Sequence, residues 1–314
     1  VIDEAILKKC NLIIAHHPFI FRGLKSITGK NEIERCVIKA IRNDVAIYAA
    51  HTNLDSSPNG VSFKIAEKIG LKNCKVLQPQ SDILLKLVTF VPTANAEVVR
   101  NAIFEAGAGH IGNYDMCSYN LQGEGTFRAS EGTNPFVGKI EEIHHEKEIR
   151  IETVLPAYLK NKVLSALIKA HPYEEPAFDF YPLDNVSMQI GSGLIGELEK
   201  EEDEISFLKR IKAIFNIVKH SELTGKKIKN VALCGGAGSF LINKAISSKA
   251  DVFLTGDIKY HDFFLADNKL LIADIGHFES EQYTKEIFFE IIRKKIPTFA
   301  THFSEVNSNP INYL

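Results

Sequence analysis

The chain has 314 residues, of which 45% are hydrophobic and 24% are charged, with a formal net charge of −2 at pH 7. This balance is typical of a globular protein with enough apolar side chains for one large core or two ordinary ones. The near-neutral charge gives no basic field, so nucleic-acid binding is not expected. No apolar run approaches the ~18 residues of a membrane span, and we expect no membrane segment and no signal peptide.

The cysteines are odd in number and scattered, and no two of them form a C-x-x-C pair: Cys10, Cys36, Cys74, Cys117 and Cys234. This usage predicts free thiols in a reducing, cytoplasmic compartment. The first residue is Val1, and the opening segment VIDEAILKKC already has a helical pattern. We therefore expect the natural protein to begin upstream of this residue.

Helix-like and strand-like segments alternate from residue 1 to residue 81. The expected helices are 1–10, 31–43 and 61–70, and the expected strands are 11–15 and 45–50. Alternation of this kind predicts parallel β-α-β units. The same pattern returns over 186–314, with helices at 206–215, 239–248 and 283–295 and strands at 230–234, 251–256 and 269–275.

The middle of the chain, 82–185, has a different order of elements. A strand at 83–92 leads to an amphipathic helix at 96–107 that ends in glycine. Two strand-like stretches, a helix at 157–171 and a strand at 177–183 follow. This β-α-β-β-α-β order is the ferredoxin-like arrangement. We predict an α/β fold in which an α+β module, 82–185, interrupts a split domain of 1–81 and 186–314, with junctions near 77–82 and 183–193 where Pro, Gly, Ser and Gln gather.

Chemically useful side chains follow the five strands of the split domain. In open α/β sheets, ligands bind beyond the carboxyl ends of the strands. The residues at these ends are His16 and His17, then His51 and Asp55, then Gly235–Ser239, then Asp257 and His261, and finally Gly276, His277 and Glu281. Imidazole, carboxylate or glycine therefore follows every one of these strands.

Each of these features alone also has a purely structural interpretation. Adjacent histidines at a strand end are often only exposed, and His51 with Asp55 suits a hydrogen-bonded turn. Glu281 in the first turn of a helix would suit the helix dipole. The GGAGS stretch fits close packing as well as anion binding, and it lacks the lysine of a P-loop.

Taken together, the residues predict a metal site. Imidazole and carboxylate ligands suit Zn, Mn, Fe, Co or Ni. Three histidines and two carboxylates exceed the needs of one tetrahedral ion, and they could serve two ions if one carboxylate bridges. Paired ions ~3.5–4 Å apart share a water and clamp attacking and leaving oxygens, and a metal can lower the pKa of its water to ~7.

The motifs HHP, HTNLD, LCGGAGS, TGDIKYHD and GHFESE, in this order, resemble the GTP cyclohydrolase I type 2 homologues, the Nif-three-like family. The resemblance covers nearly the whole chain. It implies a site for two divalent metal ions, with Glu281 as the bridge, on these five residues: His16, His17, Asp55, His277 and Glu281. It also implies substrate-facing, catalytic roles for His51 and His261.

The middle module is similar to PII and CutA proteins, and HPYEEPAFD at 171–179 looks like the signature at the end of that module. We expect the loop that carries His171, Glu174 and Glu175 to shape or cover a site rather than to bind metal. His144 and His145 belong to a charged stretch and are expected in a solvated hairpin. The resemblance further implies a homo-oligomer, a ring-like hexamer, and a first strand and helix upstream of Val1.

Three functions fit this sequence. The first is a metal-dependent hydrolase that acts on a nucleotide or a related small molecule through a metal-bound hydroxide, with His51 or His261 moving protons. The alternative is a metal-stabilised oligomeric binding or regulatory protein without turnover, in which the module senses a small ligand. The third is metal storage or delivery, which would require both ions to exchange rapidly.

Overall fold

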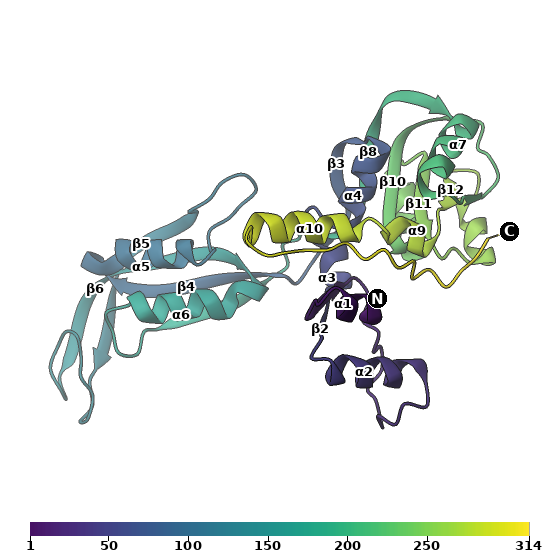
Figure 1. Ribbon diagram of the computed structural model, residues 1–314. Helices are drawn as coiled ribbons and strands as arrows, with labels where there is room; N and C mark the ends of the chain where they lie inside the picture. Colours follow the sequence, from purple (N-terminus) through teal and green to yellow (C-terminus); the bar gives the residue numbers. More distant parts are fainter. Residues whose placement is uncertain (314) are drawn as a thin grey trace. The chain divides into compact units, whose positions relative to one another are not determined.

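The computed structural model describes residues 1–313. The chain forms two compact units, which can be followed by the sequence colours of Figure 1. Unit 1 consists of Val1–Pro79 and Gln189–Leu314, and unit 2 consists of Gln80–Met188. Each unit has a buried apolar core of its own, which is the physical requirement for an independent domain.

Unit 1 is built on a six-stranded sheet with the order β3-β8-β10-β11-β12-β9. The strands are β3 (Lys72–Gln80), β8 (Ser187–Asp203), β9 (Lys219–His220), β10 (Lys227–Ala237), β11 (Val252–Gly256) and β12 (Leu271–Asp274). The three strands β10, β11 and β12 are parallel, while β8 runs antiparallel to β10 and β9 runs antiparallel to β12. The predicted α/β class, with parallel strands in the split domain, is confirmed.

Both faces of the parallel strands are covered, which explains their continuous apolar runs. Alternate side chains of β10, such as Val231 and Leu233, pack with residues of α4 (Val61–Ile69), α7 (Glu204–Phe215) and α10 (Thr284–Lys295). The intervening Ala232 belongs to the opposite face, with η3 (Ser239–Leu241), α8 (Ile242–Ser247) and η4 (Tyr260–Ala266). Packing on both faces of the sheet thereby fixes the positions of the carboxyl ends of these strands.

A separate two-stranded parallel sheet carries the amino-terminal part of unit 1. It pairs β1 (Leu12–Ala15) with β2 (Ala46–Ala49) and is accompanied by α1 (Ile2–Leu7), α2 (Glu32–Arg42) and the short α3 (Thr52–Asp55). The pairing continues past the strands, because the backbone N–H of His51 donates to the carbonyl of His16 at 2.8 Å. The residues that follow both strands are therefore fixed side by side.

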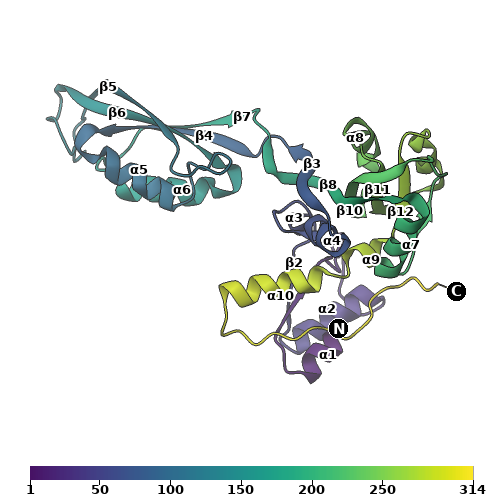
Figure 2. The same cartoon turned by 90° about the horizontal axis from the view of Figure 1, so that it is seen from above.

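Unit 2 is a four-stranded antiparallel sheet with the order β5-β6-β4-β7. Its elements are β4 (Leu84–Pro92), η1 (Thr93–Asn95), α5 (Ala96–Glu105), β5 (Ser118–Arg128), β6 (Ile143–Pro156), η2 (Ala157–Leu159), α6 (Lys160–Ala170) and β7 (Phe178–Leu183). Helices α5 and α6 lie together on one face of the sheet (Figure 2). Strand order and connectivity are those of the ferredoxin-like fold, as predicted for the inserted module.

The two stretches expected as junctions are largely strand. β3 covers residues up to Gln80, and β8 begins at Ser187. Proline is tolerated at position 79 because β3 is the edge strand of its sheet. A Cβ on Gly191 would lie 2.2 Å from the carbonyl oxygen of Gln78, so glycine there permits close strand approach rather than a loop. Residues typical of turns thus serve strand packing in this place.

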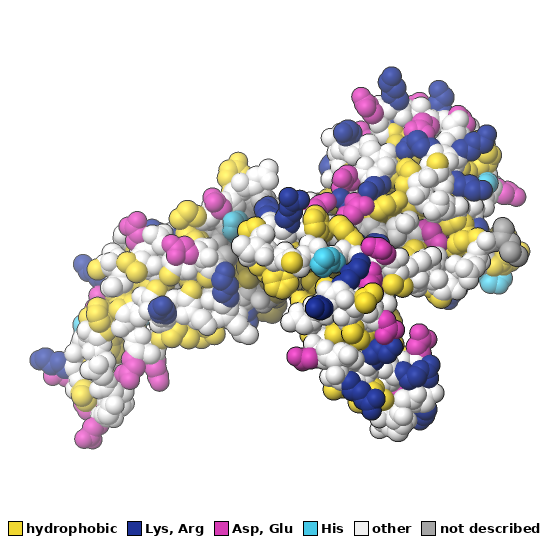
Figure 3. Space-filling model, viewed as in Figure 1, with side chains coloured by type: hydrophobic (Ala, Val, Ile, Leu, Met, Phe, Trp, Pro, Cys, Tyr) yellow, Lys and Arg dark blue, Asp and Glu magenta, His cyan; other side chains and the backbone are white. Residues whose placement is uncertain are grey.

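The surface and the helices agree with the composition. Within residues 1–313, no helix is both long and apolar enough to cross a membrane. Lysine and arginine side chains are interspersed with acidic ones over the face seen in Figure 3. All five cysteines are free thiols.

Candidate metal centre

The five predicted metal ligands all come from unit 1, but from two different sheets. His16 and His17 directly follow β1, and Asp55 is the last residue of α3, which follows β2. His277 and Glu281 are the first and last residues of α9 (His277–Glu281), which follows β12. Their spacing of four residues places both on one face of that helix.

The chain turns sharply between β12 and α9. Asp274, at the end of β12, is buried and accepts hydrogen bonds from the backbone N–H groups of Gly276 at 2.9 Å and Ile258 at 3.2 Å. Gly276 has a φ of 81°, and a Cβ there would lie 2.1 Å from Oε2 of Glu279. Only glycine therefore fits this turn. Asp274 and Gly276 together fix where the helix begins.

Glu281 lies at the centre of the cluster. Its Oε1 is 3.5 Å from Nε2 of His16, and its Oε2 is 3.4 Å from Nε2 of His17 and 3.2 Å from Nε2 of His277. On the first of these sides, Nε2 of His16 is also 3.4 Å from Oδ1 of Asp55. The two carboxylate oxygens of Glu281 thus face two different groups of side chains. Because Glu281 ends its helix, the alternative that it serves the dipole of a helix start is wrong.

Several buried polar atoms in the cluster lack a hydrogen-bond partner among residues 1–313. They are both ring nitrogens of His16, Oδ1 of Asp55 and Oε2 of Glu281. His16 and Glu281 are each only 8% exposed. Buried polar atoms in proteins are nearly always paired, so these atoms require a partner that the protein does not supply. His16, His17 and Glu281 each offer a ligand atom within 4.8 Å of the other two, so a cation there would pair with one ring nitrogen of His16 and with the carboxylate of Glu281.

The electrostatics of the cluster favour a cation as well. Burial raises the pKa of Asp55 to about 6 and, outweighing the attraction of Glu281, lowers the pKa of His17. The carboxylate of Glu281 raises the pKa of His277 to about 9, although burial opposes this. Burial also opposes ionisation of Glu281, but its imidazole neighbours outweigh it and lower the pKa to about 2. A metal ion would take over the role of the proton on His277.

Asp257 was named at a strand end in the sequence analysis but was given no role there, and the structure places it against a ligand candidate. Its Oδ2 accepts a hydrogen bond from Nδ1 of His277 at 2.6 Å. This contact leaves Nε2 of His277 directed at Glu281 and fixes the orientation of the ring. Asp257 directly follows β11, so the strand-end pattern contained it. The rule that a metal-binding histidine donates its second nitrogen to a carboxylate could have identified it.

The glycines of the GGAGS stretch allow close packing. Gly236 has a φ of 63°, and a Cβ there would lie 2.2 Å from Oε1 of Glu281. Its backbone N–H donates to Oγ of Ser280, on α9, at 3.0 Å. Gly256, at the end of β11, also permits close approach, because a Cβ at this position would lie 2.8 Å from the backbone nitrogen of His277. Glycine at these positions allows α9 to lie directly against β10 and β11.

The two histidines expected to face a substrate differ in their surroundings. The ring of His51 is 5.1 Å from that of His17 and 5.9 Å from that of His16. His261 lies on η4, where its ring neighbours are Tyr260 and Phe264. In the described part of the chain, His261 has no hydrogen bond, ion pair or ring contact with the five ligand candidates. The structure brings His51 to the cluster and leaves His261 outside it.

The remaining histidines of interest belong to unit 2. His171 is buried, its Nε2 donates to the carbonyl of Phe90 at 2.9 Å, and its Nδ1 accepts from the backbone N–H of Tyr173 at 3.1 Å. Both of its ring nitrogens are therefore occupied. His144 and His145 lie on β6, in the hairpin with β5, and each contacts a glutamate at 2.9 Å.

Comparisons with known proteins agree with the motifs. The sequence model of the Duf34/NIF3 (NGG1p interacting factor 3) family matches residues 1–310. A protein of Halalkalibacterium halodurans named GTP cyclohydrolase 1 type 2 homolog is 42% identical, over all of this chain and 86% of its own length. A protein of Bacillus subtilis with the same name is 37% identical, with the same coverage of both chains.

Solved structures agree at the level of the whole chain. The crystal structure of a Bacillus cereus protein related to NIF3 superposes with a TM-score of 0.84 at 39% identity, covering all of this chain and 86% of its own. Staphylococcus aureus protein SA1388 gives a TM-score of 0.73 at 31% identity, covering all of this chain and 85% of its own. Sequence, fold and motif order therefore lead to one conclusion: the chain belongs to the Duf34/NIF3 family.

Proposed function

We propose that this protein holds two divalent metal ions on His16, His17, Asp55, His277 and Glu281, and that it is a metal-dependent hydrolase. Its substrate would be a nucleotide or a related small molecule. The name of the relatives, GTP cyclohydrolase 1 type 2 homolog, supports the nucleotide class. The donor set of imidazole and carboxylate suits Zn, Mn, Fe, Co or Ni.

One observation carries the proposal: the two oxygens of Glu281 face different partners. Oε1 faces His16, which also contacts Asp55, and Oε2 faces His17 and His277. A carboxylate placed between two groups of ligands is the arrangement that a bridge between two ions requires. A single ion would leave part of this buried donor set without a partner.

The chemistry divides between the ions and the chain. When bound, a pair of divalent ions supplies Lewis acidity, which acidifies water and polarises the bond to be broken. Asp257 keeps Nε2 of His277 directed at the site, and Gly236 leaves room for the carboxylate of Glu281. The imidazole of His51, whose ring centre is 5.1 Å from that of His17, lies beside the ligand set and would serve as the proton-transfer group.

Metal content per chain tests the site. Elemental mass spectrometry on protein purified without chelator should find two ions per chain, and Glu281→Gln should lose most of both because it removes the bridging charge. Glu305→Gln, a change at an exposed side chain outside the cluster, should keep the wild-type content. One ion or none after reconstitution with excess metal would refute the dinuclear site.

Turnover separates the hydrolase from the regulatory alternative. Metal-loaded protein should convert a member of a nucleotide panel headed by GTP, and conversion should stop with chelator and in Glu281→Gln. Two tightly held ions with no conversion across the panel would favour the metal-stabilised binding protein instead.

The free cysteines further support a cytoplasmic location. The homohexamer implied by the resemblance can be tested by light scattering.

A further inference from the structure

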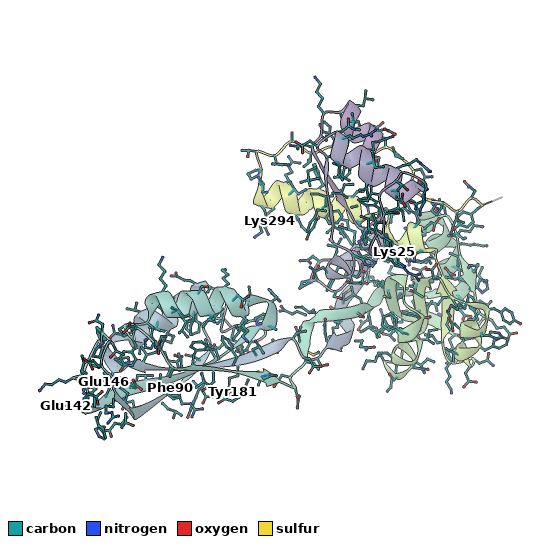
Figure 4. All side chains as sticks on the ribbon, turned by 90° about the horizontal axis from the view of Figure 1, so that it is seen from below. Lys25, Phe90, Glu142, Glu146, Tyr181 and Lys294 are labelled. Atoms are coloured by element: carbon teal, nitrogen blue, oxygen red, sulfur yellow. The ribbon has the colours of Figure 1, made fainter. Side chains whose placement is uncertain are left out.

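A cavity of about 860 Å³ lies within unit 2, well apart in sequence from the metal ligands. Phe90 on β4 and Glu148 and Arg150 on β6 line it, whereas the alternate residues Val91 and Ile149 pack with the helices. Since side chains alternate across a strand, the cavity lies on the sheet face opposite α5 and α6. Figure 4 shows this sheet lengthwise, from Glu142 and Glu146 through Phe90 to Tyr181. The volume is that of a small-molecule site.

A buried carboxylate without a cationic partner lines this cavity. Glu148 is 8% exposed, and its Oε1 accepts a hydrogen bond from the hydroxyl of Tyr173 at 2.8 Å. Among residues 1–313, no lysine, arginine or histidine lies within ion-pair distance of it. Glycine at position 125 makes room for the carboxylate, because a Cβ there would lie 2.3 Å from Oε2. Buried carboxylates are normally paired with a positive charge.

The arginines that line the cavity do not neutralise Glu148. Arg150 pairs with Glu152 at 2.8 Å, and its guanidinium lies 6.0 Å from the ring centre of Phe90. Arg128 is exposed and has no ion pair in the described structure. The lining contains more carboxylates than arginines, namely Glu124, Glu148, Glu174 and Glu175 against Arg128 and Arg150. The cavity therefore has a negative balance with its most buried charge at Glu148.

Aromatic rings form the wall beside this carboxylate. The ring centre of Tyr173 is 5.9 Å from that of Phe127 and 6.3 Å from that of Phe136. Burial, followed by the hydrogen bond to Glu148, raises the pKa of Tyr173, so its hydroxyl keeps its proton and remains a donor to that carboxylate. Aromatic faces attract organic cations, most strongly where water is excluded.

We propose that this cavity binds a small organic ammonium ion, with its cationic group at Glu148 and its apolar part against Phe127, Phe136 and Tyr173. The four features act together: a buried unpaired carboxylate, a net negative lining, an aromatic wall and a small-molecule volume. A bare metal ion would leave most of the cavity and its apolar wall unused. An anion would meet Glu148 directly. The site is independent of the metal centre and of the hydrolase proposal.

The test uses three probes that share a phenylethyl or phenylmethyl skeleton and differ in charge. Phenethylammonium is the cation, 2-phenylethanol the neutral analogue and phenylacetate the anion. Calorimetric titration of the full chain should show binding of phenethylammonium, with 2-phenylethanol weaker by about ten-fold or more and phenylacetate not bound. Saturation-transfer NMR should place the phenyl ring in contact with aromatic protons of the protein. No binding of the cation, or equal binding of cation and alcohol, would overturn the proposal.

Variants locate the site. Glu148→Gln keeps an acceptor for Tyr173 and removes the charge. It should therefore weaken the binding of phenethylammonium by about ten-fold and leave the affinity for 2-phenylethanol unchanged. Glu131→Gln removes an exposed charge from the neighbouring loop, outside the lining, and should have no effect. Phe136→Ala, at an exposed ring, should weaken cation and alcohol alike without unfolding the chain. Unchanged cation binding in both Glu148→Gln and Phe136→Ala would contradict the assignment.

Discussion

The proposed metal centre depends on single residues that contact the candidate ligands without being ligands themselves. Asp257 orients His277 through a hydrogen bond of 2.6 Å, and Gly236 provides the space that the carboxylate of Glu281 fills. Neither residue would hold a metal ion itself. The precision of the cluster therefore comes from contacts one step removed from the proposed ions.

Replacing Asp257 should weaken metal binding while leaving the fold intact. In Asp257→Asn the side chain that accepts the hydrogen bond from His277 loses its charge. We expect metal affinity to fall by about 10- to 100-fold. Asp257 is largely exposed, so the melting temperature of the metal-free protein should stay close to that of the wild type. Competition with a chromophoric chelator measures the affinity. Asp44→Asn, at an exposed position with a φ of 53°, is the matched control.

Equal affinity in Asp257→Asn and Asp44→Asn would mean that the ring of His277 is oriented by its helix alone. A large loss of melting temperature in metal-free Asp257→Asn would instead assign Asp257 to the fold.

At the scale of elements, the hydrophobic patterns predicted helices and central strands well. The helices expected at 61–70 and 206–215 are α4 and α7, and the strands expected at 230–234 and 251–256 lie within β10 and β11. These segments were predictable because each buries a face with a clear period. The bounds of β3 and β8 were not predicted, since these strands contain Pro and Gly residues that allow close strand approach where the sequence suggested junctions.

Convergence of the ligands is the part of the site that sequence patterns could not give. The strand-end rule applies to one sheet, whereas His16, His17 and Asp55 follow the strands of the small sheet and His277 and Glu281 follow a strand of the large one. No periodicity relates two sheets. The family resemblance supplied the grouping that local physical patterns lack.

The loop before β7 should make the stability of unit 2 dependent on pH. His171 ties this loop to β4 through its neutral ring, with Nε2 as donor and Nδ1 as acceptor. Burial lowers the pKa of His171 below the ordinary 6.5, although Glu148 and the Phe90 carbonyl oppose this. The folded state therefore takes up a proton less readily than the unfolded state. The contribution of neutral His171 to the stability of unit 2 is fully present above pH 6.5, and it is lost as the pH falls towards the pKa of His171 in the folded state.

Urea titrations at pH 7.5 and pH 5.5 can measure this contribution. The unfolding free energy of unit 2 should fall more between these values in the wild type than in His171→Gln, which has no titrating ring. His110→Gln, at an exposed histidine, should retain the wild-type dependence. Parallel losses in all three proteins would remove His171 as the cause.

At the scale of the whole molecule, the chain contains two units with separate cores. The proposed metal ligands all belong to unit 1, and the proposed ammonium cavity belongs entirely to unit 2. A ligand stabilises only the unit that it binds. The two proposed sites should therefore be separable in thermal unfolding.

Scanning calorimetry of metal-loaded protein should show two unfolding transitions. Removal of metal with EDTA should lower the midpoint temperature of one transition. The unfolding free energy of that unit should fall by about 4 kcal/mol if the free metal concentration had been a thousand times the dissociation constant. Val99→Ala, in the core of unit 2, should lower the other transition because it leaves a cavity. A single transition that shifts as a whole in both experiments would show that the units unfold together.

The position of β3 beside β8 has a consequence for how such a protein can evolve. The chain leaves the large sheet at Gln80 and re-enters it at Ser187, on two neighbouring strands. Gly191 and the carbonyl of Gln78 lie close enough to exclude a side chain between them. A single genetic event could therefore exchange everything between these points for a tight hairpin. The sheet would keep all its partners, and the ligand residues would keep their places.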